Sequence, residues 1–379
     1  MGQGAFYAES FHLQGMPDPI NVVFDCGVLP ESMLLKGLNL SLPTAFGLDR
    51  TIHAVFISHL HDDHVNGLDE LKRRYDVKRV YYPGIDKEDK YLMDFWYRLN
   101  GQEGGVSYEL CMGEASQINR FPGTELRPIG AEVSDGEEVK DVTLGDIATA
   151  GQRSEEATKT RERIANSKFA NWRFRPFNYR RDALIQSVEK RLAPILPPGG
   201  LSDENVDVLW KKYGKNRIKE AYGPVKHFNT NSMVFFSGPP LSTSNRAEHF
   251  SQHLECCHQK PCSACGTLLA RPAGCLYTGD YDASCDERWE KLQNHYKGLQ
   301  NDCRDDGDAI GCLQVPHHGS QENFNPKFLD KDRIYVASVG LYNSYGHPHQ
   351  CVRLAFQEKK MALFCVTEQQ ESCICTIVW

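Results

Sequence analysis

The segment His59–His64, with the sequence HLHDDH, constrains the fold of this chain more than any other feature. It places three imidazoles and two carboxylates directly after the apolar stretch Ala54–Ser58, which has the length and composition of a buried strand. His59 and His61 stand two residues apart, so on extended backbone both side chains point to the same side and can bind one metal ion. The segment, called the metal motif below, predicts a metal-binding loop at the end of a strand.

The second half of the metal motif can hold a second ion through Asp63 and His64. Gly67 and the amphipathic stretch Leu68–Arg74 then predict a helix. Imidazole and carboxylate ligands with open water positions suit Zn²⁺ or Mn²⁺. The alternative is a solvated polar loop, or histidines that are satisfied inside the core. The succession of strand, motif, glycine and helix favours the metal loop.

One loop cannot complete two coordination spheres, so further ligands are expected at other strand ends. Asp280 follows the apolar stretch Leu276–Thr278 and is placed to bridge two ions. The pair His317 and His318 follows the stretch Leu313–Val315, and the sequence leaves open which of the two is the ligand. Each feature alone also fits an ordinary turn. Together with the metal motif they predict a centre for two divalent cations.

Composition excludes several other classes. The 379 residues include 40% hydrophobic and 25% charged residues, as soluble globular proteins do. No apolar run approaches the ~20 residues that span a bilayer, and the first residues do not resemble a signal peptide, so a cytoplasmic protein is expected. The formal net charge of −7 is not that of a general nucleic-acid-coating protein. In a reducing compartment, the 14 cysteines favour metal ligation or apolar packing over disulfides.

The ordered set of candidate residues resembles the metallo-β-lactamase superfamily. The set is Asp25, His59, His61, Asp63, His64, Asp280, His317 and His318. The resemblance implies an α+β fold, a four-layer αββα sandwich with a dinuclear centre at one edge, with residues 1–379 as a single domain. It also implies two divalent cations, zinc or manganese. Asp25 fits the role of accepting the N–H of a ligand histidine and thereby fixing its tautomer.

Within the superfamily, the sequence resembles the hydrolase domain of the DNA-uptake competence protein and the stand-alone hydrolases similar to it. The segments that carry this resemblance are Gly2–Gly4, Asn229–Ser232, Val315–Ser320, Ser338–Gly340, Asn343 and Gly346–Pro348. That branch often has an aspartate where His61 stands. The superfamily also usually supplies one more histidine before Asp280. The strand expected there, Glu125–Pro128, has none, and His227 is the nearest candidate.

Two segments are expected to interrupt the sandwich. Residues 137–225 are charged and helical in pattern, with few strand signals, and predict a partly basic insertion. Residues 242–274 predict a second insertion, a Cys/His-rich loop that binds a structural zinc ion through a C-x₂-C pair and upstream ligands. Its candidate ligands are Cys256, Cys257, His258, Cys262 and Cys265. Loose reduced thiols, or a redox pair of Cys262 and Cys265, are the alternatives.

The first insertion contains the stretch 171–181, which interleaves aromatic residues with arginines. Arginine contacts phosphates and aromatic rings stack on unpaired bases, so this stretch is a candidate lip for binding single strands. The candidate contacts are Trp172, Arg173, Arg175, Arg180 and Arg181. The alternative is an amphipathic patch that packs on the core or on a partner chain.

The chemistry expected of such a centre is hydrolysis. Asp63 is expected to hold the second ion and to orient the nucleophilic water. A leaving alkoxide then needs a proton or a positive neighbour. His347, Asn343 and the histidine of the pair that binds no metal are the candidates for that role.

The leading hypothesis is a dinuclear metal-dependent phosphodiesterase, a nuclease that prefers single-stranded nucleic acid. It depends mainly on the branch resemblance. A small-molecule phosphodiester hydrolase, acting on a cyclic nucleotide or a choline phosphodiester, is the first alternative, because the acidic remainder of the chain suits a narrow pocket. A subunit of a defence or uptake assembly that needs a protein partner, or a homo-oligomer, is the second. Lactam hydrolysis is disfavoured for a cytoplasmic protein.

Overall fold

The computed structural model of the chain describes residues 5–28, 32, 34–131, 141–196, 203–223, 231–240, 246–252, 271–299, 309–331, 333–340, 343–367 and 373–378. Among them, one five-stranded sheet has the order β1-β2-β4-β6-β7. Its strands are β1 (Phe6–Phe11), β2 (Ile20–Cys26), β4 (Ala54–Phe56), β6 (Arg79–Pro83) and β7 (Glu125–Ile129). The turn-rich segment 15–19 predicts the antiparallel pairing of β1 with β2, which is confirmed, and the remaining neighbours pair in parallel.

Parallel strands need crossover connections, and helices occupy those of this sheet. They are α1 (Leu34–Phe46), α2 (Asp62–Val65), α3 (Leu68–Arg74), α4 (Lys90–Asn100) and α5 (Val106–Met112). Helix α3 lies where the amphipathic pattern predicts it. Helix α5 corrects an expectation, because the sequence between residues 101 and 133 favours short strands only. The short strands β3 (Thr51–Ile52) and β5 (Asp76–Val77) pair with each other beside this sheet.

A second, seven-stranded sheet has the order β16-β15-β14-β13-β10-β9-β8. Its strands are β8 (Val142–Thr143), β9 (Arg173–Arg180), β10 (Asn231–Gly238), β13 (Gly274–Tyr277), β14 (Ile310–Gln314), β15 (Ile334–Ser338) and β16 (Leu363–Val366). Strands β13 to β16 run parallel, whereas β13, β10, β9 and β8 alternate in direction. The apolar stretches 232–236, 276–278, 313–315, 334–339 and 362–366 each predict a strand, and β10, β13, β14, β15 and β16 confirm these predictions.

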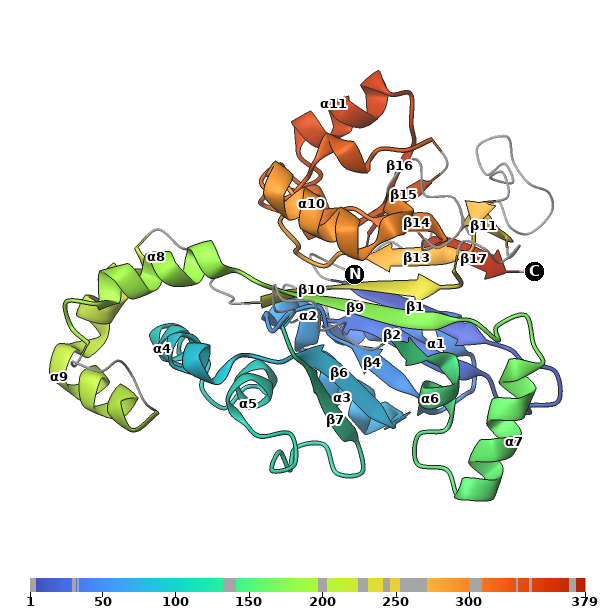
Figure 1. Ribbon diagram of the computed structural model, residues 1–379, viewed down its shortest axis with the longest axis horizontal. Coiled ribbons are helices and arrows are strands. Elements are labelled where there is room, and N and C mark those ends of the chain that lie inside the picture. Colours follow the sequence, from blue (N-terminus) through green and yellow to red (C-terminus); the bar gives the residue numbers. More distant parts are fainter. Residues whose placement is uncertain are drawn as a thin grey trace.

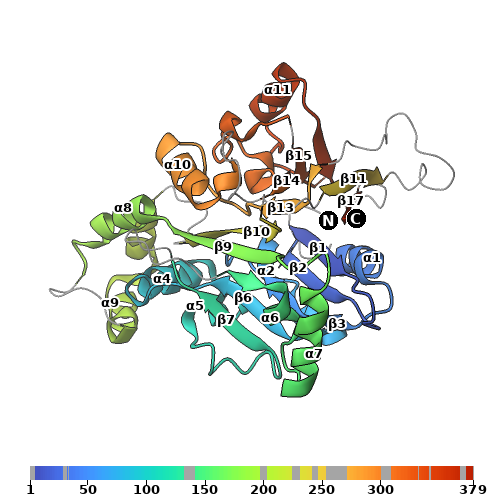
Figure 2. The same ribbon diagram turned by 45° about the vertical axis from the view of Figure 1, so that its right-hand side comes forward.

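The remaining described elements are helices and a small third sheet. They are α6 (Leu144–Ala148), α7 (Ser154–Ala165), α8 (Asp182–Leu192), α9 (Asp203–Tyr222), α10 (Asp286–His295), α11 (Gln350–Glu358) and a small sheet of β12 (Arg271–Pro272), β11 (Arg246–Gln252) and β17 (Cys373–Val378). Figures 1 and 2 show α10 and α11 on the side of the second sheet away from the first, and α8 and α9 beside α4 at one end of the molecule. No described helix has the length and apolar character needed to cross a membrane.

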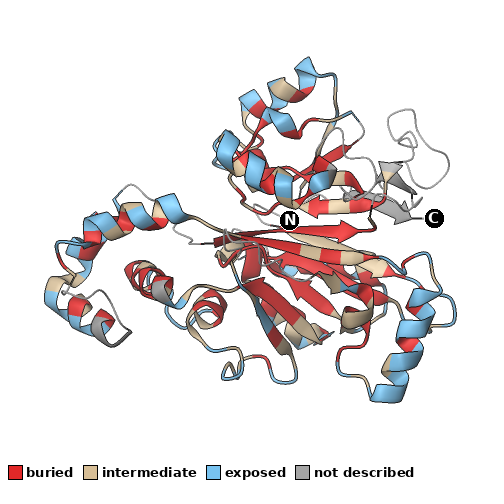
Figure 3. Cartoon of the chain, in the orientation of Figure 1, coloured by how far each residue is buried: buried red, intermediate tan, exposed pale blue. Residues whose placement is uncertain are grey.

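An aromatic layer holds the two sheets face to face. The ring centroids of Phe24 on β2 and Tyr277 on β13 are 3.9 Å apart, and those of Phe56 on β4 and Phe174 on β9 are 5.4 Å apart. Figure 3 shows that the strands of both sheets are largely buried. Separate apolar clusters lie between the first sheet and its helices, and between the second sheet and α10 and α11.

The boundary of the first predicted insertion is therefore wrong. Strand β9, from within residues 137–225, pairs with β10 over its full length, and its Phe174 is part of the layer between the sheets. Six residues of this strand are aromatic or charged, so its sequence carries no clean alternation of apolar and polar residues. Phe174 of β9 packs in the aromatic layer, whereas the arginines of β9 form the ion pairs with aspartates described below, and these two uses explain the mixed composition.

Candidate metal centre

The metal motif lies directly against the end of β2 because two glycines permit a very close approach. A Cβ atom on Gly27 would lie 2.1 Å from the backbone carbon of Asp63, and one on Gly67 would lie 1.9 Å from the carbonyl oxygen of Cys26. Any larger residue would separate the motif from the strand. Helix α2 begins after His61, and two carboxylates occupy its first turn, where the helix N-terminus favours negative charge.

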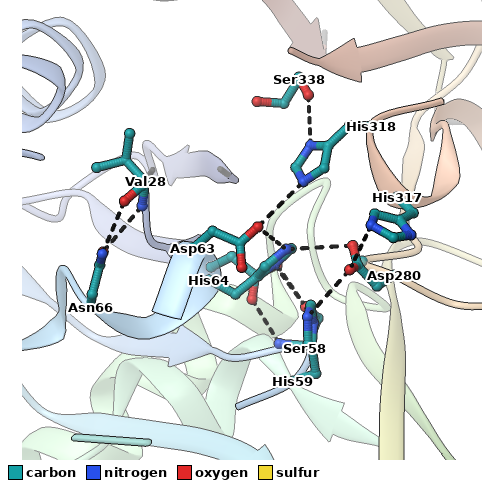
Figure 4. A network of polar contacts seen from close by, with 12 residues as sticks. Val28, Ser58, His59, Asp63, His64, Asn66, Asp280, His317, His318 and Ser338 are labelled. Atoms are coloured by element: carbon teal, nitrogen blue, oxygen red, sulfur yellow. Dashed lines mark hydrogen bonds and ion pairs between the residues drawn. The ribbon is translucent and has the colours of Figure 1, made fainter. Parts of the chain in front are cut away.

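Side-chain hydrogen bonds fasten the same contact (Figure 4). The Asn66 amide donates to the Val28 carbonyl at 2.9 Å, and the Val28 N–H donates to the Asn66 amide oxygen at 3.1 Å. Val28 lies beyond the end of β2, and the Asn66 side chain supplies its backbone N–H and carbonyl with hydrogen-bond partners. The loop after β2 and the end of α2 are held as one unit.

Asp25 orients the buried histidine of the motif. Its backbone has φ = 52°, in the left-handed region, and its carboxylate accepts hydrogen bonds from the Ser58 N–H at 2.7 Å and the Ser58 hydroxyl at 2.8 Å. His64 Nδ1 lies 2.8 Å from the same carboxylate. Because a carboxylate accepts, the His64 proton in this bond is on Nδ1, and Nε2 faces the centre. This is the role that the sequence analysis expects of Asp25.

Asp280 lies close to three histidines of the centre (Figure 4). Its Oδ2 lies 3.4 Å from both His59 Nε2 and His317 Nε2, and its Oδ1 lies 3.5 Å from His64 Nε2. Two ligand atoms at ~2.1 Å from one tetrahedral ion are about 3.4 Å apart. These distances therefore match atoms that share a metal ion better than direct hydrogen bonds.

Asp63 is the second carboxylate that lies close to histidines of the centre. Its Oδ2 lies 3.7 Å from His318 Nε2 and 3.9 Å from His64 Nε2. Three groups among the described residues have ligand atoms within 4.8 Å of one another. They are His59, Asp63 and His64; His59, His61 and Asp280; and His64, Asp280 and His318. His59, His64 and Asp280 each belong to two groups, so the groups adjoin one another, as two adjacent ions would require.

The structure distinguishes the two histidines that follow β14. His318 is buried, its Nδ1 donates to the Ser338 carbonyl at 2.7 Å, and its Nε2 belongs to a ligand group. His317 remains 29% exposed, and its Nδ1 lies 2.9 Å from the Asn323 side-chain oxygen. His318 is thus the better ligand candidate of the pair, while His317 borders the centre on its open side.

Four buried atoms aimed at the centre have no hydrogen-bond partner among the described residues. They are His59 Nε2, His64 Nε2, His318 Nε2 and Asp280 Oδ1. Buried polar atoms normally have partners, because leaving one unpaired costs about 1–3 kcal/mol. Imidazole nitrogens and carboxylate oxygens are the ligands of zinc and manganese, so these residues fit the implied cations.

The charges of the metal-free centre are unequal. Burial lowers the pKa of His59 well below its ordinary value, and neighbouring His64 lowers it further. For His64 burial acts in the same direction, but the carboxylates of Asp25 and Asp63 outweigh it and raise its pKa. Burial alone would raise the pKa of Asp280, yet His317 and His59 hold it well below the ordinary value. The acid is therefore ionised and ready to bind a cation.

His347 lies beside the centre, as expected, but it is poorly suited to supply a proton. Its ring centroid is 5.7 Å from that of His317. Burial, with His317 and His318 adding to it, lowers the pKa of His347 to about 4, so the ring is neutral near pH 7. Asn343 is used structurally: it accepts from the His347 N–H at 2.8 Å and donates to the His347 carbonyl at 3.0 Å. The prediction that Asn343 acts on the leaving group has no support in this geometry.

Most residues of the expected single-strand-binding lip have partners within the chain, so they do not form a free basic and aromatic surface. Trp172 is buried, and its indole N–H donates to the Ser237 hydroxyl at 2.9 Å, so it presents no face to a base. Arg175 pairs with Asp141 at 2.9 Å, and Arg173 lies 3.5 Å from the same carboxylate. Arg180 similarly pairs with Asp89 at 2.7 Å. A sequence window does not show these partners, because they are 32 to 91 residues away.

Arg181 differs from its three neighbours. It is half-buried, and no described residue forms a hydrogen bond or ion pair with its guanidinium. Burial lowers its pKa, while the charges of Asp282 and Asp280 act in the opposite sense. Arg181 is therefore a cation in the electrostatic range of the metal centre that lacks a direct counter-ion.

Sequence reasoning missed several supports of the centre. Ser58 and Asn323 position Asp25 and His317, and the carbonyl of Ser338 orients His318. Ser58 directly precedes the metal motif and could have been noticed, whereas Asn323 and Ser338 carry no local signal. His227 and the zinc candidates Cys256, Cys257, His258, Cys262 and Cys265 lie outside the described residues.

Comparison with known families agrees with this geometry. The model of the Metallo-beta-lactamase superfamily matches residues 20–160, which include Asp25 and the metal motif. Residues 20–160 thus form a domain of that superfamily, whose members are generally metal-dependent hydrolases. A search of curated proteins found no match to the chain.

Proposed function

We propose that this chain is a metal-dependent phosphodiesterase that holds two divalent cations, zinc or manganese, and acts on single-stranded nucleic acid. The superfamily domain and a His/Asp cluster that could bind metal support the hydrolase part of the proposal. The observation that carries it is a set of four buried, neighbouring atoms that could bind metal and that have no hydrogen-bond partner among the described residues. We also propose that residues 1–379 form one αββα sandwich resembling the hydrolase domain of the DNA-uptake competence protein.

The substrate class follows from charge. Bound divalent cations would supply a water with a pKa near ~7 and would polarise a phosphoryl oxygen. His59, His61, Asp63, His64, Asp280 and His318 would hold the cations. Asp25 and Ser338 keep two of these histidines in the tautomer that directs Nε2 inward. Arg181 adds a cation without a direct counter-ion, which favours an anionic ester over a neutral amide.

A small phosphodiester is the second candidate substrate, and a specific observation favours it. Arg173, Arg175 and Arg180 are paired with aspartates, so they do not offer an extended basic groove. A narrow site that contacts one phosphate through Arg181 also suits a cyclic nucleotide or a choline phosphodiester. The two candidates differ in whether a long strand is bound better than a small ester.

Hydrolysis of three substrates with added Mn²⁺ or Zn²⁺ tests the proposal: single-stranded DNA, duplex DNA and bis(p-nitrophenyl) phosphate. Cleavage of the single strand supports the lead proposal, and turnover of the small ester alone supports the second candidate. Activity that appears only when a protein partner is added supports the assembly hypothesis. No turnover of any phosphodiester contradicts the function proposed here.

A variant of Arg181 tests whether its guanidinium binds the phosphate of the substrate. Arg181→Ala should raise KM for a phosphodiester by about tenfold or more, because a hydrogen bond to a charged group contributes roughly 1.5–3 kcal/mol. Arg163→Ala, which removes an exposed arginine from α7, is the matched control and should leave KM unchanged. An equal effect of both variants would show that only general charge matters.

The structural zinc proposed for residues 242–274 has a separate test. Cys262→Ser should lower the zinc content by about one ion and reduce the melting temperature, because a structural site contributes folding free energy. The catalytic cations should remain. Unchanged zinc stoichiometry and stability would identify Cys262 as an ordinary thiol.

A further inference from the structure

An exposed aromatic side chain lies next to the metal centre. Tyr345 is 54% exposed, and it is the aromatic residue among the exposed large hydrophobic residues that the structure describes. Its ring stacks on that of His347 with an interplanar angle of 9° and a centroid distance of 6.0 Å. The stacking holds one side of the tyrosine ring in place while more than half of the residue remains in solvent.

The loop that carries Tyr345 is held firmly in position. Asn343 bonds to the Gly340 carbonyl at 2.7 Å and to both backbone polar groups of His347. Gly346 then adopts φ = 71°, which a residue with a Cβ rarely does. The exposed ring is thus presented by a fixed turn, so binding a ligand would require little ordering of the loop.

His317 lies between the stacked pair of Tyr345 and His347 and the metal centre. The His347 ring lies 5.7 Å from the His317 ring, and His317 Nε2 lies 3.4 Å from the Asp280 carboxylate. His347 Nδ1 is buried and has no hydrogen-bond partner in the described part of the chain. This second, independent feature also points to a ligand at the same place, since buried polar atoms are normally bonded.

We propose that Tyr345 and His347 form a stacking platform for an unpaired nucleobase beside the scissile phosphate. The inference rests on the proposed function and names its substrate class. A ligand with an anionic ester for the cations and Arg181, and a flat ring for Tyr345, is a nucleotide unit. Bases inside a duplex are already stacked on one another, so the platform selects single strands.

Equilibrium binding tests the platform without turnover. A single-stranded oligonucleotide containing 2-aminopurine is titrated with the full chain after chelation of metal, and quenching of the fluorescent base reports stacking. Tyr345→Ala should abolish the quenching and raise Kd by about tenfold. Tyr345→Phe should keep both, because it retains the ring. Leu354→Ala, which truncates an exposed side chain on α11, is the matched control and should behave as the unaltered chain does.

The outcomes separate the two proposals. Quenching and Kd that are the same in Tyr345→Ala as in the unaltered chain would overturn the platform, as would a lack of quenching by the unaltered chain. Turnover of bis(p-nitrophenyl) phosphate by the metal-loaded, unaltered chain is measured in parallel. If that turnover occurs while the platform fails, the phosphodiesterase proposal stands without it. If binding behaves as expected but no phosphodiester is hydrolysed, the platform stands and the catalytic proposal fails.

Discussion

At the residue scale, backbone strain is concentrated at the metal centre. Among the described residues other than glycine, those with positive φ are Asp25, His317, His318 and Lys360. Three of these four border the centre, and such a conformation costs of order 1–3 kcal/mol when held by its surroundings. The strain directs the side chains of two histidines and one carboxylate to a common point. The hydrogen bonds of Ser58, Asn323 and Ser338 hold them there.

Replacing Asp25 tests the orienting role. Asn tolerates the left-handed backbone but presents an amide where the carboxylate accepts from His64. Asp25→Asn should therefore weaken metal affinity by about 10–100-fold, the usual effect of losing a partner behind a ligand. Competition with a chromogenic chelator measures this. Unaltered affinity would mean that Ser58 and the backbone orient His64 without the carboxylate.

Replacing Asp63 tests its role as a ligand. Asp63→Ala should lower the metal content from about two ions towards one. It should also reduce turnover at least ~10–100-fold, which is the usual effect of losing only a residue that supports a ligand. The adjacent Asp62 offers a matched control, because its carboxylate accepts from Gln102 at 2.9 Å and Ser107 at 3.2 Å, away from the ligand groups. Asp62→Ala should keep both ions. Near-normal turnover in a folded Asp63→Ala chain contradicts the dinuclear proposal.

At the element scale, the centre is assembled where strand ends meet. Asp25 ends β2, the metal motif follows β4, Asp280 follows β13, and the histidine pair follows β14. The carboxyl ends of parallel strands in one sheet lie at the same edge, and the two sheets bring two such edges together. Short segments far apart in sequence thus deliver their polar residues to one place. The close glycine contact between β2 and α2 sets the spacing.

Gly27→Ala tests that contact. The added Cβ would lie 2.1 Å from the Asp63 backbone, so either α2 or β2 must shift. Overpacking of this kind costs roughly 1–3 kcal/mol, and the displacement should also weaken metal binding. Gly130→Ala serves as the control, since a Cβ there meets nothing within 4 Å. Denaturant unfolding and metal titration of both variants give the comparison, and equal stability of the two would show that the loop adapts freely.

At the scale of the whole molecule, a chain of polar contacts links the two sheets through their aromatic layer. Ser237 on β10 donates to Glu9 on β1 at 2.6 Å, and Tyr277 on β13 donates to the same carboxylate at 2.9 Å. Trp172 extends the chain by donating to Ser237. Burial raises the pKa of Glu9 from its ordinary 4.5 to about 7, against the lowering effect of these two hydroxyls.

This shift has a defined effect on stability. The folded chain keeps a proton on Glu9 that the unfolded chain releases, so the contribution of Glu9 to the free energy of unfolding is lost as pH rises from about 4.5 to about 7. The Glu9→Gln variant has no titrating group at this position. Its stability relative to the unaltered chain should therefore increase between about pH 4.5 and about pH 7, as urea unfolding would measure. Glu156→Gln, on exposed α7, is the control: its free energy of unfolding should differ from that of the unaltered chain by the same amount at every pH. If the difference for Glu9→Gln is also independent of pH, the linkage is contradicted.

The sequence alone identified the residues that gather at the candidate metal centre and most of the strands. Histidines two apart on a strand end, followed by a carboxylate, have few uses other than metal binding, and the apolar strands around them are short and unambiguous. Helix α3 and strands β4, β10 and β13 to β16 lie where the pattern predicts them. These features depend on contacts within a few residues, which is the range that a sequence pattern reports.

The tertiary structure decided which charges are available. The arginines of β9 look free in the sequence, yet aspartates from distant segments pair with Arg173, Arg175 and Arg180. Arg181, directly after β9, has no direct partner within the part of the chain that the structure describes. His317 and His318 are adjacent and identical in type, and only their contacts with Asn323 and Ser338 separate their roles. Ion pairs and ligand shells form between segments that folding brings together, so their partners carry no mark in the local sequence.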